Sequence, residues 1–268
     1  MSAPLKLHWW AAKPNFGDAI SRAIVARVSG RDVTWAKPGQ ADVFAIGSIM
    51  HVVRRGNRAP RADGMRPVVW GTGMLKPVQV DFLGNVDVAL LRGPISESLL
   101  GVSVPGYGDP GLLISEVIDA PAREDRIGLV PHYAQLEDPG FREMIAAHPV
   151  LKLIDVRGEA LEVCRQIAAC AHVVSSSLHG LIVADSFGVA NTWLNPAGIH
   201  ASPALKFLDY AAGIERALPR PVDLGDLPGL LAGLPTGPLP YAAGVARSKG
   251  DLLHSFPVAL KSAEESLQ

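Results

Sequence analysis

The chain has 268 residues, of which 48% are hydrophobic and 19% charged, and its formal net charge at pH 7 is −1. This composition is typical of a globular protein with a sizeable core, and the balanced charge and scarce aromatic residues argue against a nucleic-acid partner. No apolar run reaches the roughly 18 residues of a membrane span, and the N-terminus lacks the pattern of a signal peptide. We therefore expect a cytoplasmic protein without a transmembrane segment, which can still touch a membrane surface peripherally.

Short apolar runs of strand length recur in the first half of the chain, each ending in glycine or a polar residue. They cover residues 5–10, 32–35, 42–48, 67–73 and 86–93. Runs that are apolar throughout are typical of parallel strands covered on both faces. Between the first two runs, apolar residues from Ile20 onward repeat at helical spacing, and Asp18 is expected to cap that helix.

A polar, proline-containing stretch at residues 116–126 precedes a second half in which the pattern starts again. Strands are expected at 127–133, 151–156, 172–176 and 190–195, and helices at 139–147, 159–171, 179–188 and 248–266. Alternating strands and helices predict an α/β fold with mostly parallel sheets. We expect two Rossmann-like domains facing a cleft, residues 1–118 and residues 119–268 with the C-terminal helix.

The stretch "SSSLHG" stands between a predicted strand and a buried helix. Ligands bind at this edge of a parallel sheet, and a helix N-terminus attracts anions. Ser175, Ser176 and Ser177 would add hydroxyl donors, Gly180 would let a ligand approach the backbone, and His179 could bind an anion or move a proton. These residues predict a cradle for phosphate or carboxylate. The alternative is that the serines only cap the helix and the histidine is structural.

Other polar residues also follow predicted strands. Asn15, Gly17 and Asp18 form a loop before the first helix, which could be no more than a capped turn. Arg92 and His132 each end an apolar strand at the ligand edge, with an ordinary loop residue as the alternative for both.

Several further patterns bear on the chemistry. Lys206 and Asp209 lie in an aromatic helix, where a surface salt pair is the plain alternative to a binding role. Cys164 and Cys170 are expected in one helix as buried thiols, and dispersed histidines give no metal spacing, so no metal is expected. Dinucleotide, P-loop and nucleophile-elbow motifs are absent.

The segment "SSSLHGLIVADSFGV" resembles the signature of the polysaccharide pyruvyl transferases. Further blocks resemble that family in the expected order: "NFGDAI", "IGSIM", "WGTGM", "LRGPIS", "GDPGLLI", "IGLVPHY" and "LKFLDY". Any one block is a weak signal, whereas the ordered set is specific and covers most of the chain.

The resemblance implies two Rossmann-like domains arranged as in GT-B glycosyltransferases, with the acceptor on the N-terminal side and the donor on the C-terminal side. It implies transfer of an enolpyruvyl group from phosphoenolpyruvate, as donor substrate and without a cofactor, to a saccharide that can be lipid-linked. His179 and Asp18 would be catalytic, and Asn15 and Gly17 would meet the acceptor. The donor would bind at the serines and Gly180, with Arg92, His132 and Lys206 as further ligands.

One position departs from the family pattern. Many members carry arginine where this chain has Ser177, and that arginine is thought to hold the donor anion. The missing cation must then come from elsewhere, and Arg92, reaching across the cleft, is the first candidate. Two other functions stay open: a GT-B-type glycosyltransferase that uses a nucleotide sugar, and a non-catalytic glycan-binding paralogue.

Overall fold

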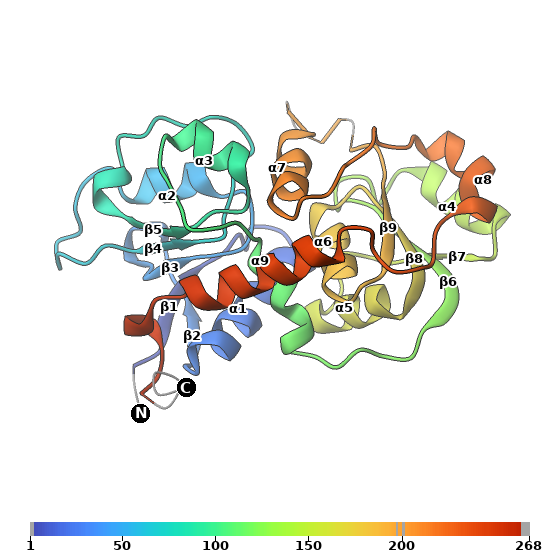
Figure 1. Ribbon diagram of the computed structural model, residues 1–268. Helices are drawn as coiled ribbons and strands as arrows, with labels where there is room; N and C mark the ends of the chain where they lie inside the picture. Colours follow the sequence, from blue (N-terminus) through green and yellow to red (C-terminus); the bar gives the residue numbers. More distant parts are fainter. Residues whose placement is uncertain (1–2, 197, 200–201, 264–268) are drawn as a thin grey trace.

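The computed structural model describes residues 3–196, 198–199 and 202–263, and it places two parallel β-sheets side by side (Figure 1). The first sheet has the strand order β2-β1-β3-β4-β5 and the second has the order β7-β6-β8-β9. All pairings within both sheets are parallel. The α/β class and the parallel sheets predicted from the sequence are confirmed.

Most of the strands are shorter than the apolar runs that predict them, and two strands of the second sheet begin before their predicted runs. Those of the first sheet are β1 (Leu5–His8), β2 (Val33–Trp35), β3 (Val43–Phe44), β4 (Val68–Trp70) and β5 (Asp87–Leu90). Those of the second are β6 (Glu124–Val130), β7 (Leu151–Leu153), β8 (Cys170–Ser175) and β9 (Ala190–Trp193). In several runs the remainder continues as a buried loop at the carboxyl end of the strand, as Ala45 and Ile46 do after β3.

The α-helices mostly connect successive strands. They are α1 (Phe16–Ser29), α2 (Met50–Gly56), α3 (Pro94–Leu100), α4 (Pro139–Ala147), α5 (Ala160–Ala169), α6 (Leu178–Ser186), α7 (Leu205–Gly213), α8 (Leu227–Leu230) and α9 (Ala242–Ser255). Short 3-10 helices are η1 (Pro38–Gln40), η2 (Leu83–Asn85), η3 (Pro110–Glu116), η4 (Leu224–Asp226), η5 (Leu231–Gly233) and η6 (Val258–Leu260).

Two sequence expectations about these helices are corrected. The last helix ends at Ser255 rather than near residue 266, because Pro257 cannot continue it; residues 264–268 of the expected helix lie outside the described residues. Cys170 is not in a helix with Cys164, since it opens β8 directly after α5. Both thiols are buried and free, and burial raises the pKa of Cys170 to about 11.

The two sheets are joined by one continuous apolar core. A single cluster of buried side chains runs from Leu5 and Ile24 in the first half to Ile182 and Phe207 in the second. Helix α9 lies across both halves in Figure 1, and the Trp70 indole donates to the Leu252 carbonyl oxygen at 3.0 Å. This shared core fixes the two sheets relative to each other, whereas a GT-B-like domain arrangement stays a prediction.

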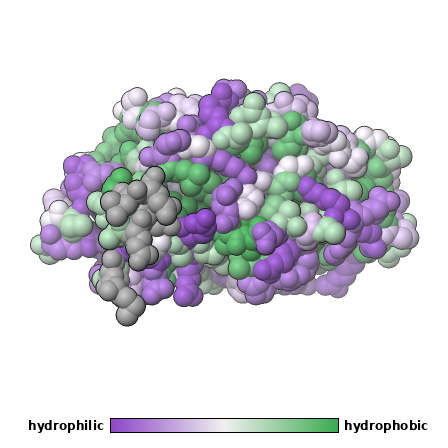
Figure 2. All heavy atoms as spheres, turned by 60° about the horizontal axis from the view of Figure 1, so that its bottom comes forward, coloured by the Kyte–Doolittle hydropathy of each residue, from purple (hydrophilic) through white to green (hydrophobic). Residues whose placement is uncertain are grey.

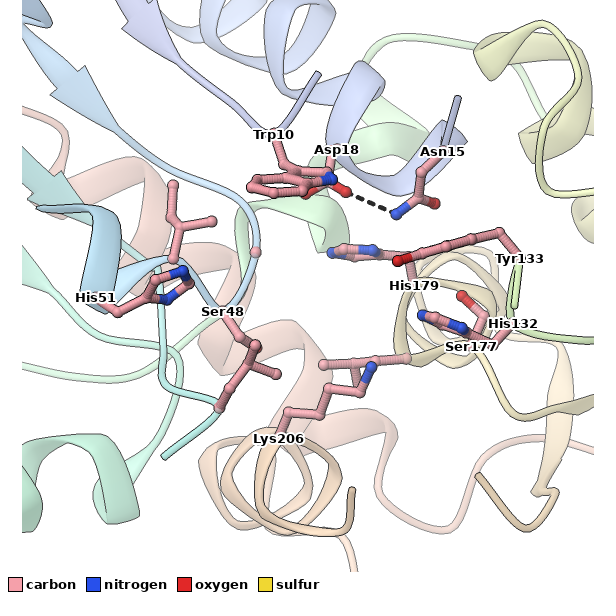
Figure 3. Close-up of a pocket in the computed structure, with 14 residues that line it drawn as sticks. Trp10, Asn15, Asp18, Ser48, His51, His132, Tyr133, Ser177, His179 and Lys206 are labelled. Carbon is pink, nitrogen blue, oxygen red and sulfur yellow. Dashed lines mark hydrogen bonds between the residues drawn. The ribbon is translucent and has the colours of Figure 1, made fainter. Parts of the chain in front are cut away.

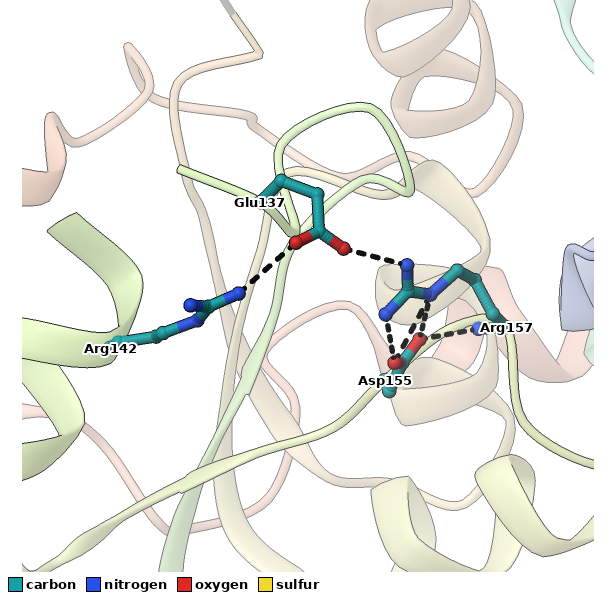
Figure 4. A network of polar contacts seen from close by, with 4 residues as sticks. All are labelled: Glu137, Arg142, Asp155 and Arg157. Carbon is teal, nitrogen blue, oxygen red and sulfur yellow. Dashed lines mark hydrogen bonds and ion pairs between the residues drawn. The ribbon is translucent and has the colours of Figure 1, made fainter. Parts of the chain in front are cut away.

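A network of exposed ion pairs ties together two loops at the edge of the second sheet (Figure 4). Glu137, in the loop before α4, accepts hydrogen bonds from Arg142 at 3.1 Å and from Arg157 at 2.8 Å. Arg157 also pairs with Asp155 at 2.7 Å in the loop after β7. Exposed pairs stabilise a fold little, but this network holds together the loop that carries His132 and the loop whose Val156 carbonyl oxygen accepts a hydrogen bond from the Phe16 amide.

Polar and apolar side chains are interspersed on the face of the molecule drawn in Figure 2. Within the described ranges, none of the helices combines the length and apolarity required to cross a bilayer.

Candidate active site

A cavity of about 240 Å³ lies between the two halves of the chain (Figure 3). The first half contributes Trp10, Asn15, Asp18, Gly47, Ser48, Ile49, His51 and Leu75 to its wall. The second half contributes His132, Tyr133, Ser177, Leu178, His179 and Lys206. Most of these residues follow the carboxyl end of a parallel strand, where ligands of α/β proteins bind.

The strand orders explain why these loops meet at one place. In the first sheet, the chain leaves β1 and β3 on opposite sides, so a crevice opens beyond their carboxyl ends. The second sheet has the same switch between β6 and β8. Loops after β1 and β3 supply one wall of the cavity, and loops after β6 and β8 supply the opposite wall.

Helix α1 begins at the cavity and fixes Asp18 there. Asn15, and not Asp18 as the sequence suggested, is the N-cap: its Oδ1 accepts from the Gly17 amide at 3.3 Å. The Asn15 Nδ2 then donates to Asp18 Oδ2 at 2.6 Å. The Phe16 amide donates to the Val156 carbonyl oxygen at 2.9 Å, which anchors the start of α1 to the second half.

Gly17, predicted as an acceptor ligand, is not part of the cavity wall, and it packs against His179. A Cβ added at Gly17 would stand 2.0 Å from His179 Nδ1. Any other residue here would push the imidazole away from its place. The early "NFGD" loop and the "SSSLHG" segment, which are about 160 residues apart in the sequence, therefore form one contact.

His179 lies in the first turn of α6 with its ring at the centre of the cavity (Figure 3). Only 8% of the residue is exposed, and its ring packs edge-on against Phe16. Its Nε2 is buried and, within the part of the chain that the structure describes, has no hydrogen-bond partner. Burial, followed by the positive charges of Lys206 and Arg92, lowers the pKa of His179 to about 3. The imidazole is thus neutral at physiological pH in the free protein.

Asp18 and Lys206 are the two charged groups in the cavity wall, and burial shifts both toward neutrality. Burial raises the pKa of Asp18 to about 7, although Asn15 and the Lys206 charge oppose the shift. Burial and the Arg92 charge lower the pKa of Lys206 to about 8. A carboxyl group that titrates near pH 7 can serve as a general acid or base at neutral pH.

Asp18→Asn is expected to stabilise the protein at alkaline pH. Because the folded-state pKa is raised, the folded protein holds an extra proton between about pH 4 and 7, and stability falls as pH rises through that window. Asparagine cannot ionise, so the variant should gain up to about 4 kcal/mol of unfolding free energy at pH 8 and almost nothing at pH 4. Chemical denaturation at both pH values measures this. Asp125→Asn, on the exposed start of β6, is the control and should change neither value, and an equal gain at both pH values would contradict the explanation.

The three serines differ in their surroundings. The Ser175 hydroxyl bonds the Val130 and Ser177 carbonyl oxygens, and the Ser176 hydroxyl accepts from the His132 amide and donates to Gln135. Both are committed to the protein and shape the loop, so the expectation that all three would face an anion is corrected. Ser177 lines the cavity as the N-cap of α6, and its side chain makes no capping bond.

Gly180 has a packing role that the sequence did not suggest, and its predicted role in ligand binding stays a prediction. A Cβ at this position would lie 2.3 Å from Ser175 Oγ, so the glycine permits close packing of α6 on β8. His132 lies in the cavity wall as predicted.

Arg92 is placed behind the cavity and not in its wall. It is fully buried, pairs with Asp209 at 3.0 Å and donates to Ser48 Oγ at 2.6 Å. Removing it would leave the buried Asp209 carboxylate without its ion pair, which commonly costs 3–5 kcal/mol. Lys206 faces the cavity, and its role as a donor ligand stays a prediction. The alternative, a surface salt pair with Asp209, does not form, because Asp209 is buried and binds Arg92 and the Ser96 amide and hydroxyl.

Trp10, Ser48, His51 and Tyr133 line the cavity but were not recognised from the sequence. Trp10, Ser48 and Tyr133 lie in the loops that directly follow strands, and this position is the signal that could have identified them; His51 lies in the first turn of α2.

Comparisons with known proteins identify the family of this chain. The model of the family described as polysaccharide pyruvyl transferase matches residues 6–197. The chain belongs to this family of transferases. The match contains the loop before α1, the α6 motif and the strands that bring them together.

This member of the pyruvyl transferase family shares only low sequence identity with two relatives. The succinoglycan biosynthesis protein ExoV of Rhizobium meliloti (strain 1021) is 26% identical over 209 residues, which cover 76% of this chain and 63% of ExoV. An uncharacterized protein of Acanthamoeba polyphaga mimivirus is 36% identical over 164 residues, 56% of each chain. The chain thus spans about three-fifths of these relatives' lengths. A crystal structure of an uncharacterized Klebsiella pneumoniae protein is similar with a TM-score of 0.49 and 11% identity, covering 82% of this chain and 92% of that one.

Proposed function

We propose that this protein transfers the enolpyruvyl group of phosphoenolpyruvate to a saccharide of an exopolysaccharide or cell-envelope glycan and closes a pyruvate ketal. Family membership and the similarity to a succinoglycan biosynthesis protein support this class of reaction. The observation that carries the proposal is the meeting of Lys206, His179 and Asp18 in one cavity at the N-terminus of α6. The transfer requires a cation, a hydrogen-bond donor and a proton donor. The Lys206 ammonium group, the neutral His179 imidazole and the Asp18 carboxyl group, whose pKa is about 7, match these requirements.

The donor carries a phosphate and a carboxylate, and both need positive partners. In the proposal, the Lys206 ammonium group, the Ser177 hydroxyl and the free amide groups at the start of α6 bind these anions. His179 Nε2, which has no hydrogen-bond partner among the described residues, donates to an oxygen atom of phosphoenolpyruvate. Lys206 supplies the cation that relatives with arginine at the Ser177 position obtain from the motif itself.

The transfer has two stages. A proton added to the methylene carbon of phosphoenolpyruvate creates an oxocarbenium-like centre at C2. One sugar hydroxyl forms a C–O bond there and loses its proton, and the C2–O bond to phosphate breaks. A second hydroxyl then attacks C2, gives its proton to the released phosphate and closes the ketal, so that donor and diol yield ketal and inorganic phosphate. Asp18, which titrates at about pH 7, is assigned the first proton transfer.

The acceptor is placed on the side of the cavity formed by the first half of the chain, beside Asn15 and Trp10. In this proposal the two sheets belong to Rossmann-like domains, residues 1–118 and 119–268, facing across the cavity as in GT-B enzymes. The enzyme would act in the cytoplasm and could receive a lipid-linked saccharide. Proton and group transfer of this kind needs no redox cofactor.

Phosphoenolpyruvate is expected to raise the melting temperature, since a ligand at a hundred times its Kd stabilises a fold by about 2.7 kcal/mol. The cavity of about 240 Å³ is below the common range of about 300–1,000 Å³ for drug-sized ligands, which favours a small donor over a nucleotide sugar. Thermal shift with phosphoenolpyruvate, UDP and GDP, followed by phosphate release with saccharides, tests the proposal. Stabilisation by UDP or GDP alone would identify a glycosyltransferase, and saccharide binding without phosphate release would identify a non-catalytic paralogue.

A further inference from the structure

Three tryptophans lie together at the carboxyl edge of the first sheet, outside the catalytic groups. Trp9 and Trp10 follow β1, and Trp35 ends β2 opposite Leu7 in the parallel register. The Trp35 indole Nε1 donates to the Trp9 carbonyl oxygen at 3.1 Å, so the ring of Trp35 adjoins the peptide that links Trp9 to Trp10. Trp10 lines the cavity, which makes the group continuous with the proposed active site.

Two of these indoles are unusually open to solvent. Trp10 is 39% exposed and Trp35 is 47% exposed, although tryptophan is usually well buried. The Trp35 ring is nevertheless held in place by its hydrogen bond and by the His8 ring, whose centroid is 5.7 Å away. A large apolar side chain that is fixed and exposed offers a flat surface to a ligand.

A second hollow, of about 570 Å³, opens beside Trp35. Its rim carries hydrogen-bonding groups, among them Lys37, Gln40 and Arg61. Arg61 is oriented by Asp63 at 2.6 Å and by the Ala41 carbonyl oxygen at 2.6 Å. The hollow thus combines one aromatic face with several polar groups.

We propose that Trp35 and this hollow bind the sugar units of the acceptor that lie beyond the unit being modified, with Trp10 as the link to the cavity. Sugar rings present apolar C–H faces that stack on indoles, and hydroxyl groups that bond amine, amide and guanidinium groups. A protein partner would need a larger contiguous apolar surface than one indole with a polar rim. This assignment rests on the proposed function, because it requires a saccharide acceptor in the cavity.

The test is calorimetric titration, without phosphoenolpyruvate, of size-fractionated oligosaccharides from partial hydrolysis of the source organism's envelope glycan. The wild-type protein should bind a four-sugar fraction about tenfold more tightly than a one-sugar fraction, the effect of one good aromatic contact. Trp35→Ala should lose that tenfold gain and leave one-sugar binding unchanged. Trp35→Phe, which keeps an aromatic face, should retain most of the gain even if the alanine variant folds poorly.

Leu253→Ala, which removes an exposed apolar side chain from α9, is the matched control and should change neither affinity. Equal binding of both fractions by the wild-type protein, or an equal loss for both in Trp35→Ala, would overturn the inference. Phosphate release from phosphoenolpyruvate is measured separately. Trp35-dependent binding without any phosphate release would refute the proposed function and leave the binding hollow intact.

Discussion

Turnover with phosphoenolpyruvate is expected to fall by about 10²- to 10⁴-fold when His179 is replaced by alanine, the range typical of a group that assists proton transfer or binds the reacting anion. The fold should survive, because His179 Nε2 has no hydrogen-bond partner in the described structure that the substitution would leave unsatisfied. What is lost within the protein is the packing of the ring against Phe16 and Gly17. Steady-state phosphate release and a thermal melt of the same preparation separate the two effects.

His172 provides a matched control, since it is a fully buried histidine whose two ring nitrogens both have partners in the protein. Its Nδ1 lies 2.6 Å from the Pro235 carbonyl oxygen and its Nε2 lies 2.9 Å from Thr192 Oγ1. His172→Ala should lower the melting temperature and leave the turnover of the folded enzyme unchanged. The structural interpretation of His179 would be restored if its alanine variant kept full activity, or if both variants lost activity only through unfolding.

Because their pKa values differ, His179 and Asp18 are expected to affect the pH dependence of turnover differently. His179, with a pKa near 3, stays neutral from pH 5 to 8 and contributes no break there. Asp18 is protonated below about pH 7 and can then donate to the methylene carbon. Turnover limited by that step should therefore fall as pH rises above 7.

The sequence predicts the helices and strands well, and it predicts the side-chain contacts between them less well. Apolar runs predicted the strands because buried parallel strands need no polar face, and "SSSLHG" predicted the start of α6 because Ser177 stands where an N-cap is needed. Neither half of the sequence predicts the order of the strands in its sheet. Without these orders, nothing places Asp18 beside His179 across about 160 residues.

Burial explains the site residues that were assigned differently. Ser176 and Arg92 are polar residues at the correct edge, yet each is held by a partner elsewhere in the chain, Gln135 and Asp209. For Lys206 the sequence leaves two interpretations open, a donor ligand and a surface salt pair with Asp209. In the structure Asp209 faces Arg92, and this leaves Lys206 directed into the cavity (Figure 3). Which of two neighbouring polar residues faces a ligand depends on distant partners that a single sequence does not show.

Lys206 should be essential for donor binding. Replacing it with methionine is expected to weaken phosphoenolpyruvate binding by about 10²- to 10³-fold, the effect of removing one polar group that stabilises charge in a site from which water is largely excluded. The fold should not suffer, because burial already disfavours the charged ammonium group and lowers its pKa to about 8. Calorimetric titration with phosphoenolpyruvate, together with a thermal melt, measures both quantities.

The same pKa gives this prediction a pH test and a matched control. Lys206 is charged below about pH 8 in the free protein, so wild-type donor affinity should decline as pH rises through 8. Lys206→Arg, which stays charged, should bind the donor without that decline. The control is Lys249→Met. Lys249 lies on α9, and burial also lowers its pKa, but its ammonium group bonds the Ser115 hydroxyl of η3 and the Ser186 carbonyl oxygen at the end of α6, and it is not part of the cavity wall. Equal donor affinity in Lys206→Met and Lys249→Met would contradict the assignment of Lys206 as the cation that replaces the missing arginine.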